Sequence, residues 1–117
     1  MRLPPATHDL LLLFAGPIVW AAHFIAIYGL NGVVCARPGR AGQWAGLAWE
    51  AWAIAAVGVL AVALLGAWVA ARPRSEGEHS RRFLRWTSLA LAALAALAIA
   101  WETLAVFLVP ACSLVGR

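Results

Sequence analysis

The chain has 117 residues, of which 64% are apolar and only 12% are charged, with a mean hydropathy of +0.84. A soluble domain is about half apolar and about a quarter charged, so this composition excludes a water-soluble globular protein. The net charge of +4 is the balance of nine basic and five acidic residues. All nine basic residues are arginine, and most of them lie between apolar runs. We therefore interpret the positive charge as a signal of membrane topology rather than of nucleic-acid binding.

Three apolar runs are long enough to cross a bilayer as helices. The first, residues 10–34, has no charged residue in 25 positions, whereas about 20 helical residues cross about 30 Å of hydrocarbon. The second is residues 47–71, and the third is residues 86–109, which ends before Pro110 because proline cannot continue a helix. We predict an all-α integral membrane bundle of three helices. The segments outside the helices are 1–9, 35–46, 72–85 and 110–117.

Local signals place the helix ends and one bend. Two prolines disfavour helix before Thr7, so Thr7 or Asp9 is the expected cap of the first helix, and Ser80 is the expected cap of the third. Proline inside a helix removes a backbone hydrogen bond and clashes with the preceding turn. Pro17, which follows Gly16, therefore predicts a kink in the first span.

Alanines four residues apart form two candidate packing ridges. Small side chains let helix backbones approach closely in lipid. The alternative is that alanine and leucine simply fill the spans. The expected ridges are Ala63, Ala67 and Ala71 on the second span and Ala92, Ala96 and Ala100 on the third.

The arginines predict the orientation of the bundle. Residues 72–85 hold five of the nine, and Arg2 adds a sixth on the same side, whereas Arg37, Arg40 and Arg117 lie on the other. Cytoplasmic loops carry the excess of arginine and lysine. We therefore expect both the N-terminus and the second loop in the cytoplasm, and the C-terminus outside.

Two cysteines lie on the expected outer side, just beyond the ends of the first and third helices. They are too few for a four-thiolate metal cluster. If the two helices are neighbours, Cys35 and Cys112 can form a disulfide without movement of the backbone. A copper site at this pair is a weaker alternative, because no methionine or histidine accompanies it.

His23 is the main candidate for function. It lies twelve residues before Cys35, hence about 18 Å from it along the helix. An ionisable side chain at such depth faces the bundle interior or a partner. The structural alternative is a neutral histidine bonded to a carbonyl, to Thr103 or to a carboxylate, and the other alternative is a haem or copper ligand.

Glu102 is the expected partner of His23, because the two residues lie at a similar depth from the same face. A carboxylate in hydrocarbon either pairs or takes up a proton. A pair of His23 with Glu102 suits a structural clasp, a proton relay or a docking contact. Glu50, near the start of the second span, is expected to be an interfacial acid within reach of water, Arg37 or Arg40, and Tyr28 to be interfacial or packed.

Motifs of catalysis are lacking in the sequence. It has no glycine-rich phosphate loop, no nucleophile elbow, no zinc spacing of histidines and no aromatic-basic stripe for nucleic acid. We therefore expect neither an enzyme nor a nucleic-acid-binding protein, and we expect no cofactor beyond the haem or copper alternative at His23.

One pattern in the sequence consists of Gly16, Pro17, Trp20, His23, Phe24 and Tyr28, followed by Cys35 and the later segments 101–102 and 109–112. With this pattern the chain resembles small three-helix bacterial membrane proteins encoded beside haem-copper oxidase genes. The resemblance implies a role beside a respiratory oxidase, as an accessory or assembly component. It supplies no catalytic residues.

Together these observations predict a non-enzymatic accessory subunit or assembly helper of a larger complex in a bacterial inner membrane. Its expected partners are the lipid bilayer and either a larger membrane protein or copies of itself. One alternative is a small oligomeric transport or proton-conducting protein that uses His23 and Glu102. Another is a haem or copper carrier that uses His23.

Overall fold

The computed structural model contains three long helices and one short hairpin, and it describes residues 4–37, 43–44, 47–71 and 79–109. Each helix is long and apolar enough to span a membrane, which confirms the predicted all-α, three-helix membrane fold. The hairpin was not predicted; its two-residue strands pair Gln43 with Ala48 and Trp44 with Leu47. In chain order the elements are α1 (Pro5–Cys35), β1 (Gln43–Trp44), β2 (Leu47–Ala48), α2 (Trp49–Ala70) and α3 (His79–Leu108).

Two helices begin earlier than predicted. α1 begins at Pro5, and Pro4 precedes it without a side-chain cap. The predicted cap at Thr7 or Asp9 is therefore wrong, because proline is well suited to the first helical position, where its missing N–H needs no partner. α3 begins at His79, so that Ser80 lies in its first turn and does not cap it.

The early start of α3 carries part of the predicted arginine-rich loop onto a helix. Arg81, Arg82 and Arg85 belong to the first two turns of α3, since arginine is among the better helix-forming residues. With 30 residues, α3 is about 45 Å long, which exceeds the hydrocarbon thickness. α2 has only 22 residues, or about 33 Å.

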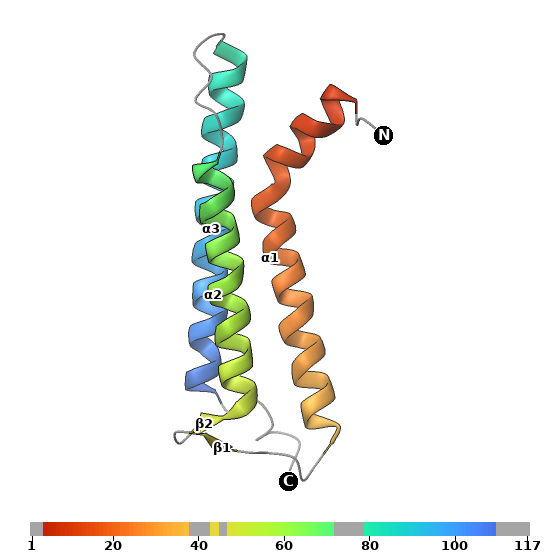
Figure 1. Cartoon of the computed structure of the whole chain (residues 1–117), viewed down its shortest axis with the longest axis vertical. Helices are drawn as coiled ribbons and strands as arrows, with labels where there is room; N and C mark the ends of the chain where they lie inside the picture. The colour runs from red at the N-terminus through yellow and green to blue at the C-terminus, as the bar shows by residue number, and fades with distance from the viewer. Residues whose placement is uncertain (1–3, 38–42, 45–46, 72–78, 110–117) are drawn as a thin grey trace.

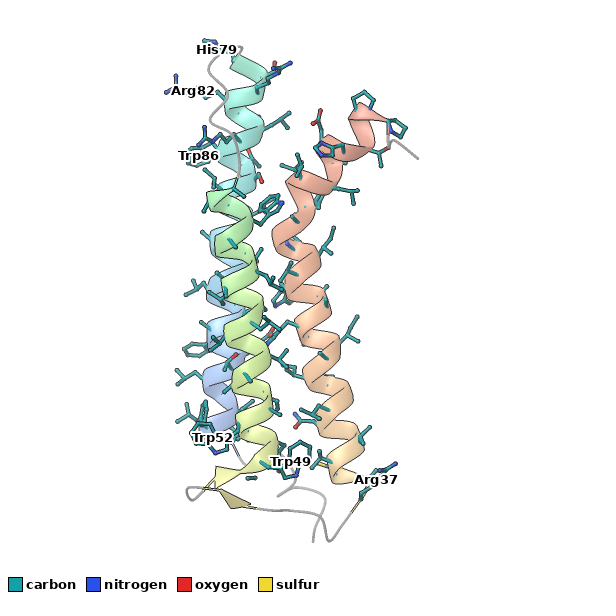
Figure 2. The ribbon with its side chains drawn as sticks, in the orientation of Figure 1. Arg37, Trp49, Trp52, His79, Arg82 and Trp86 are labelled. Carbon is teal, nitrogen blue, oxygen red and sulfur yellow. The ribbon has the colours of Figure 1, made fainter. Side chains whose placement is uncertain are left out.

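Viewed as in Figure 1, α1 runs down, α2 runs up and α3 runs down. α1 and α3 are parallel, and their N-termini lie at the same end of the bundle as the C-terminus of α2. The hairpin and the end of α1 lie at the opposite end (Figure 1). Tryptophans mark the two ends of the spans, with Trp49 and Trp52 near the hairpin and Trp86 toward the other end (Figure 2), as in the aromatic belts of membrane proteins.

α1 bends in its N-terminal half and leans away from α3 toward its N-terminus, as the proline predicts (Figure 1). Pro17 lies inside the helix, where it cannot donate to the preceding turn. Close by, the Ser88 hydroxyl of α3 donates a hydrogen bond to the Leu12 carbonyl oxygen at 3.0 Å. Hydroxyl groups of neighbouring helices commonly satisfy backbone groups near such a bend.

The closest contact of α1 with α3 is at Gly16. A Cβ added there would lie 2.8 Å from the Ala92 Cα and 2.9 Å from the Leu91 carbonyl oxygen. Only a residue without a side chain permits this approach. The backbones of α1 and α3 therefore touch next to the bend at Pro17.

The main hydrophobic cluster lies between α2 and α3 and uses only part of the predicted ridges. Ala61 and Leu65 of α2 pack with Ala95 and Ile99 of α3. Of the predicted ridges, Ala92 is buried, Ala96 is half-buried, and the others are exposed: Ala63, Ala67, Ala71 and Ala100. Alanine is so frequent in both helices that it offers several equivalent ridges, and the larger isoleucine and leucine side chains select the one that is used.

Replacing Gly16 with alanine tests the close approach. We expect Gly16→Ala to lower the free energy of unfolding by about 1–3 kcal/mol, because an added atom in a packed interface forces the helices apart. The measurement is titration of the detergent-solubilised protein with dodecyl sulfate, followed by circular dichroism. Gly29→Ala on the same helix is the control, since no atom lies within 4 Å of its added Cβ. Equal stability of the two variants would contradict the close contact.

The orientation of the bundle remains a prediction. Arg82 lies at the end that holds the N-terminus of α3, and Arg37 lies at the other end (Figure 2). If the arginine excess sets the topology, alkaline phosphatase fused at Gly77 is inactive in cells, and a green fluorescent protein fused there fluoresces. An active phosphatase fusion would reverse the assignment.

Candidate functional site

The structure brings His23 and Glu102 together. The Nδ1 atom of His23 lies 3.3 Å from Oε2 of Glu102. Only 1% of the His23 side chain is exposed, against 21% of the Glu102 side chain. Because α1 and α3 are parallel, residues at equal depth lie at the same level, which helix rise predicts, and the rotation of the two helices turns this pair toward each other.

Trp20 is a second donor to the same carboxylate, and sequence analysis did not assign it this role. Its indole Nε1–H donates to Oε1 of Glu102 at 2.9 Å. The spacing contained the signal, since residues three apart lie on one helix face, so Trp20 shares the face of His23. Each oxygen of Glu102 thus has its own partner on α1.

Thr103 does not bond to His23, which was one predicted alternative. Its hydroxyl donates instead to the Ile99 carbonyl oxygen of its own helix at 2.7 Å. Gly58 of α2 faces this hydroxyl so closely that an added Cβ would collide with the Thr103 side chain. The α2 backbone therefore packs directly against the turn of α3 that carries Glu102.

The second ring nitrogen of His23 is buried and has no hydrogen-bond partner. When Glu102 is ionised, it accepts a hydrogen bond from the Nδ1–H group of His23, and a neutral ring then has its lone pair on Nε2. An unpartnered buried nitrogen is uncommon in proteins. Chemically, the pair of His23 and Glu102 can hold α1 and α3 together, and His23 can also hold a proton at Nε2.

Glu50 differs from its predicted environment. It is buried, with 8% of the residue exposed, and its Oε2 has no hydrogen-bond partner. Within the described residues it forms no ion pair with Arg37, and Arg40 lies outside them. Asn31, which sequence analysis overlooked, also has a buried oxygen without a partner. Both residues lie toward the hairpin end of the bundle, in the last turns of α1 and the first turn of α2.

An exposed row of aromatic rings, here called the aromatic stripe, consists of Trp20, Phe24 and Tyr28. The ring centroids of Trp20 and Phe24 are 5.9 Å apart, and those of Phe24 and Tyr28 are 4.5 Å apart. Tyr28 is 65% exposed, so apart from its ring contact with Phe24 it is not packed inside the bundle, and its level relative to the membrane interface stays a prediction. The stripe begins at the residue that bonds to Glu102 and runs toward the end of α1.

The remaining candidates stay predictions. Cys35 ends α1 and is not a free thiol, but Cys112 lies outside the described residues, so their pairing is untested. His8 and His79 are exposed. Within the described part of the chain, no three histidine, cysteine or acidic side chains are grouped so that they could hold a metal ion.

Comparison of the chain with models of protein families, with curated proteins and with solved structures gives no match.

A double-mutant cycle tests the contact of His23 with Glu102. We expect His23→Leu and Glu102→Leu each to lower the free energy of unfolding, and the double variant to lose about 1 kcal/mol less than the sum, as polar contacts between membrane helices typically do. The same dodecyl sulfate titration measures all three variants. His23→Leu combined with Glu50→Leu is the control and should be additive, because the two residues share no partner. Additivity in both cycles would contradict the contact.

Thiol labelling tests the predicted disulfide. If Cys35 and Cys112 are bonded, the unreduced, denatured protein takes up no maleimide, and the reduced protein takes up two. The Cys35→Ser variant should take up one without reduction. Two labels on the unreduced protein would remove the disulfide.

Proposed function

We propose that the chain is a non-enzymatic accessory subunit or assembly factor that docks against a transmembrane helix of a larger complex in a bacterial inner membrane. The observation that carries the proposal is the position of Glu102. This carboxylate precedes Thr103, which packs against Gly58 near the middle of α2. It is held by α1, yet about a fifth of its side chain is exposed.

Contact with lipid is unfavourable for such a group. Ionisable side chains within the bilayer almost always face protein or a water-filled cavity. His23 and Trp20 each occupy one acceptor site of the carboxylate, one on each oxygen. A carboxylate offers about four such sites. A donor side chain on a neighbouring helix would use the open side.

The aromatic stripe lies on the same face of the bundle as Glu102, and it supports the assignment of this face as the contact surface. Trp20, Phe24 and Tyr28 recur every four residues and so form one continuous edge beside Glu102. Large aromatic side chains are enriched at protein interfaces because they bury much area and lose little conformational freedom. A helix laid along the stripe would cover both the rings and the carboxylate.

The identity of the complex rests on the resemblance to membrane proteins encoded beside haem-copper oxidase genes. We propose such an oxidase as the partner. A second copy of the chain could occupy the same face, and the experiment below separates the two.

Two other functions depend on His23. Proton conduction is the second candidate, because two ionisable side chains, His23 and Glu102, lie 3.3 Å apart inside the bundle. The burial of His23 disfavours a haem or copper carrier, because an axial ligand needs its nitrogen open to the metal, and only 1% of the His23 side chain is exposed.

Photo-crosslinking in native membranes tests the proposal. We expect a benzoylphenylalanine at Tyr28 to give a covalent adduct with a subunit of a multi-subunit membrane complex, identified by mass spectrometry, because Tyr28 lies on the proposed contact edge. The same probe at Val59 of α2 is the matched control, since Val59 is 70% exposed and lies on another helix.

Each outcome separates one candidate from the others. An oxidase subunit crosslinked at Tyr28 alone supports the proposal. An adduct with a second copy of the chain would indicate a homo-oligomer, and equal adducts at Tyr28 and Val59 would remove the docking face. Proton flux in liposomes that is lost on Glu102→Gln would favour conduction, and a Soret band lost on His23→Ala would favour the carrier.

A further inference from the structure

A cavity of about 620 Å³ opens between the first turns of α1 and α3, at the end where α2 stops. It exists because α1 leans away from α3 above its bend while α3 continues past α2 (Figure 1). Its volume lies within the range typical of small-molecule sites. Neither His23 nor Glu102 lines it, so it is separate from the site described above.

The cavity is apolar toward the membrane and basic toward its mouth. Leu12, Leu13 and Trp68 lie among the apolar residues that line it. Ser88, which is buried and bonded to the Leu12 carbonyl oxygen, is the lining residue of α3 farthest from the helix start. Arg85 also lines the cavity, one turn nearer to the start of α3.

The mouth carries an excess of positive charge. Arg81 and Arg85 line the cavity four residues apart, hence on one face of α3, and neither forms an ion pair within the described residues. Among the lining residues that the structure describes, the only carboxylate is that of Asp9, which lies 4.0 Å from His8 Nδ1 and is itself exposed. For these described residues, two guanidinium groups against one carboxylate leave a positive net charge that suits an anion.

The depth of the arginines matches that of lipid headgroups. Trp68 lies in the cavity wall, and Trp86, next to Arg85, is 71% exposed on the bundle surface. Tryptophans mark the level of the bilayer interface. An occupant with a phosphate at this level and acyl chains below would contact both the guanidinium groups and the leucines, whereas a free anion would leave the apolar part uncovered.

We propose that this cavity binds one anionic phospholipid, with its phosphate held by Arg81 and Arg85 and an acyl chain against Leu12 and Leu13. Basic pockets between membrane helices bind such headgroups in general. The site needs no partner protein, so it is independent of the proposed function.

Native mass spectrometry of the delipidated, full-length protein tests the proposal, with phosphatidylglycerol and phosphatidylcholine of identical acyl chains as probes. We expect one phosphatidylglycerol per chain and at least about tenfold weaker binding of phosphatidylcholine. The variant with both Arg81→Gln and Arg85→Gln should lose phosphatidylglycerol affinity by at least about tenfold, since each basic residue near an anionic headgroup raises affinity several-fold.

Arg82→Gln is the matched control. Arg82 neighbours Arg81 in sequence but lies on the side of α3 away from α1 (Figure 2), and it does not line the cavity. Its replacement should change affinity less than twofold. Ala71→Trp provides a second variant that keeps both arginines but fills part of the cavity, because Ala71 lines it, and it should weaken binding as the double variant does.

Three results would overturn the proposal. Equal losses from Arg82→Gln and the double arginine variant would indicate general attraction to anionic lipid. Equal binding of phosphatidylcholine would indicate an apolar groove without headgroup recognition. Displacement of phosphatidylglycerol by excess inorganic phosphate would indicate a site for free anions.

Discussion

The carboxylate of Glu102 needs hydrogen-bond donors at a depth where lipid offers none. α1 supplies both of them, from His23 and Trp20, and they fix α1 relative to α3 in two ways. Contact of both donors with one side chain sets the depth of α1, and the three-residue spacing of the donors sets its rotation. The polar contact thereby specifies an arrangement that apolar surfaces in lipid define only weakly.

Small residues make this contact reachable. Between helices already in hydrocarbon there is no hydrophobic driving force, and association depends on close packing. Gly16 lets α1 touch the α3 backbone at Ala92, and Gly58 lets α2 touch Thr103. One glycine lies about two turns from His23 along α1, and the other faces the residue after Glu102. The two glycines thus bring helix backbones together on either side of the polar contact.

The number of helices, their approximate spans and the pairing of His23 with Glu102 could be predicted, because span length and equal depth follow from helix rise alone. The role of Trp20 required knowledge of which face of α1 meets α3. The packing ridge of α2 was predicted wrongly and that of α3 was right only at Ala92 and Ala96, since alanine occupies so many positions on both helices that spacing does not distinguish them. The burial of Glu50 also depends on how the helices are rotated, which a position near the end of a span does not determine. The apolar run that begins at residue 86 does not mark the start of α3 at His79, because arginine favours helix as well as water.

The unequal lengths of the helices have a mechanical consequence. With 31 and 30 residues, α1 and α3 are about 45 Å long and project beyond the hydrocarbon. α2, with 22 residues, matches an average bilayer almost fully, and a mismatch in thickness costs a fraction of a kcal/mol per ångström. A thicker bilayer would have to thin around α2, and a thinner one would tilt it. Bilayer thickness therefore acts on this bundle mainly through α2, whose tilt would change the packing of Gly58 against the turn that carries Glu102.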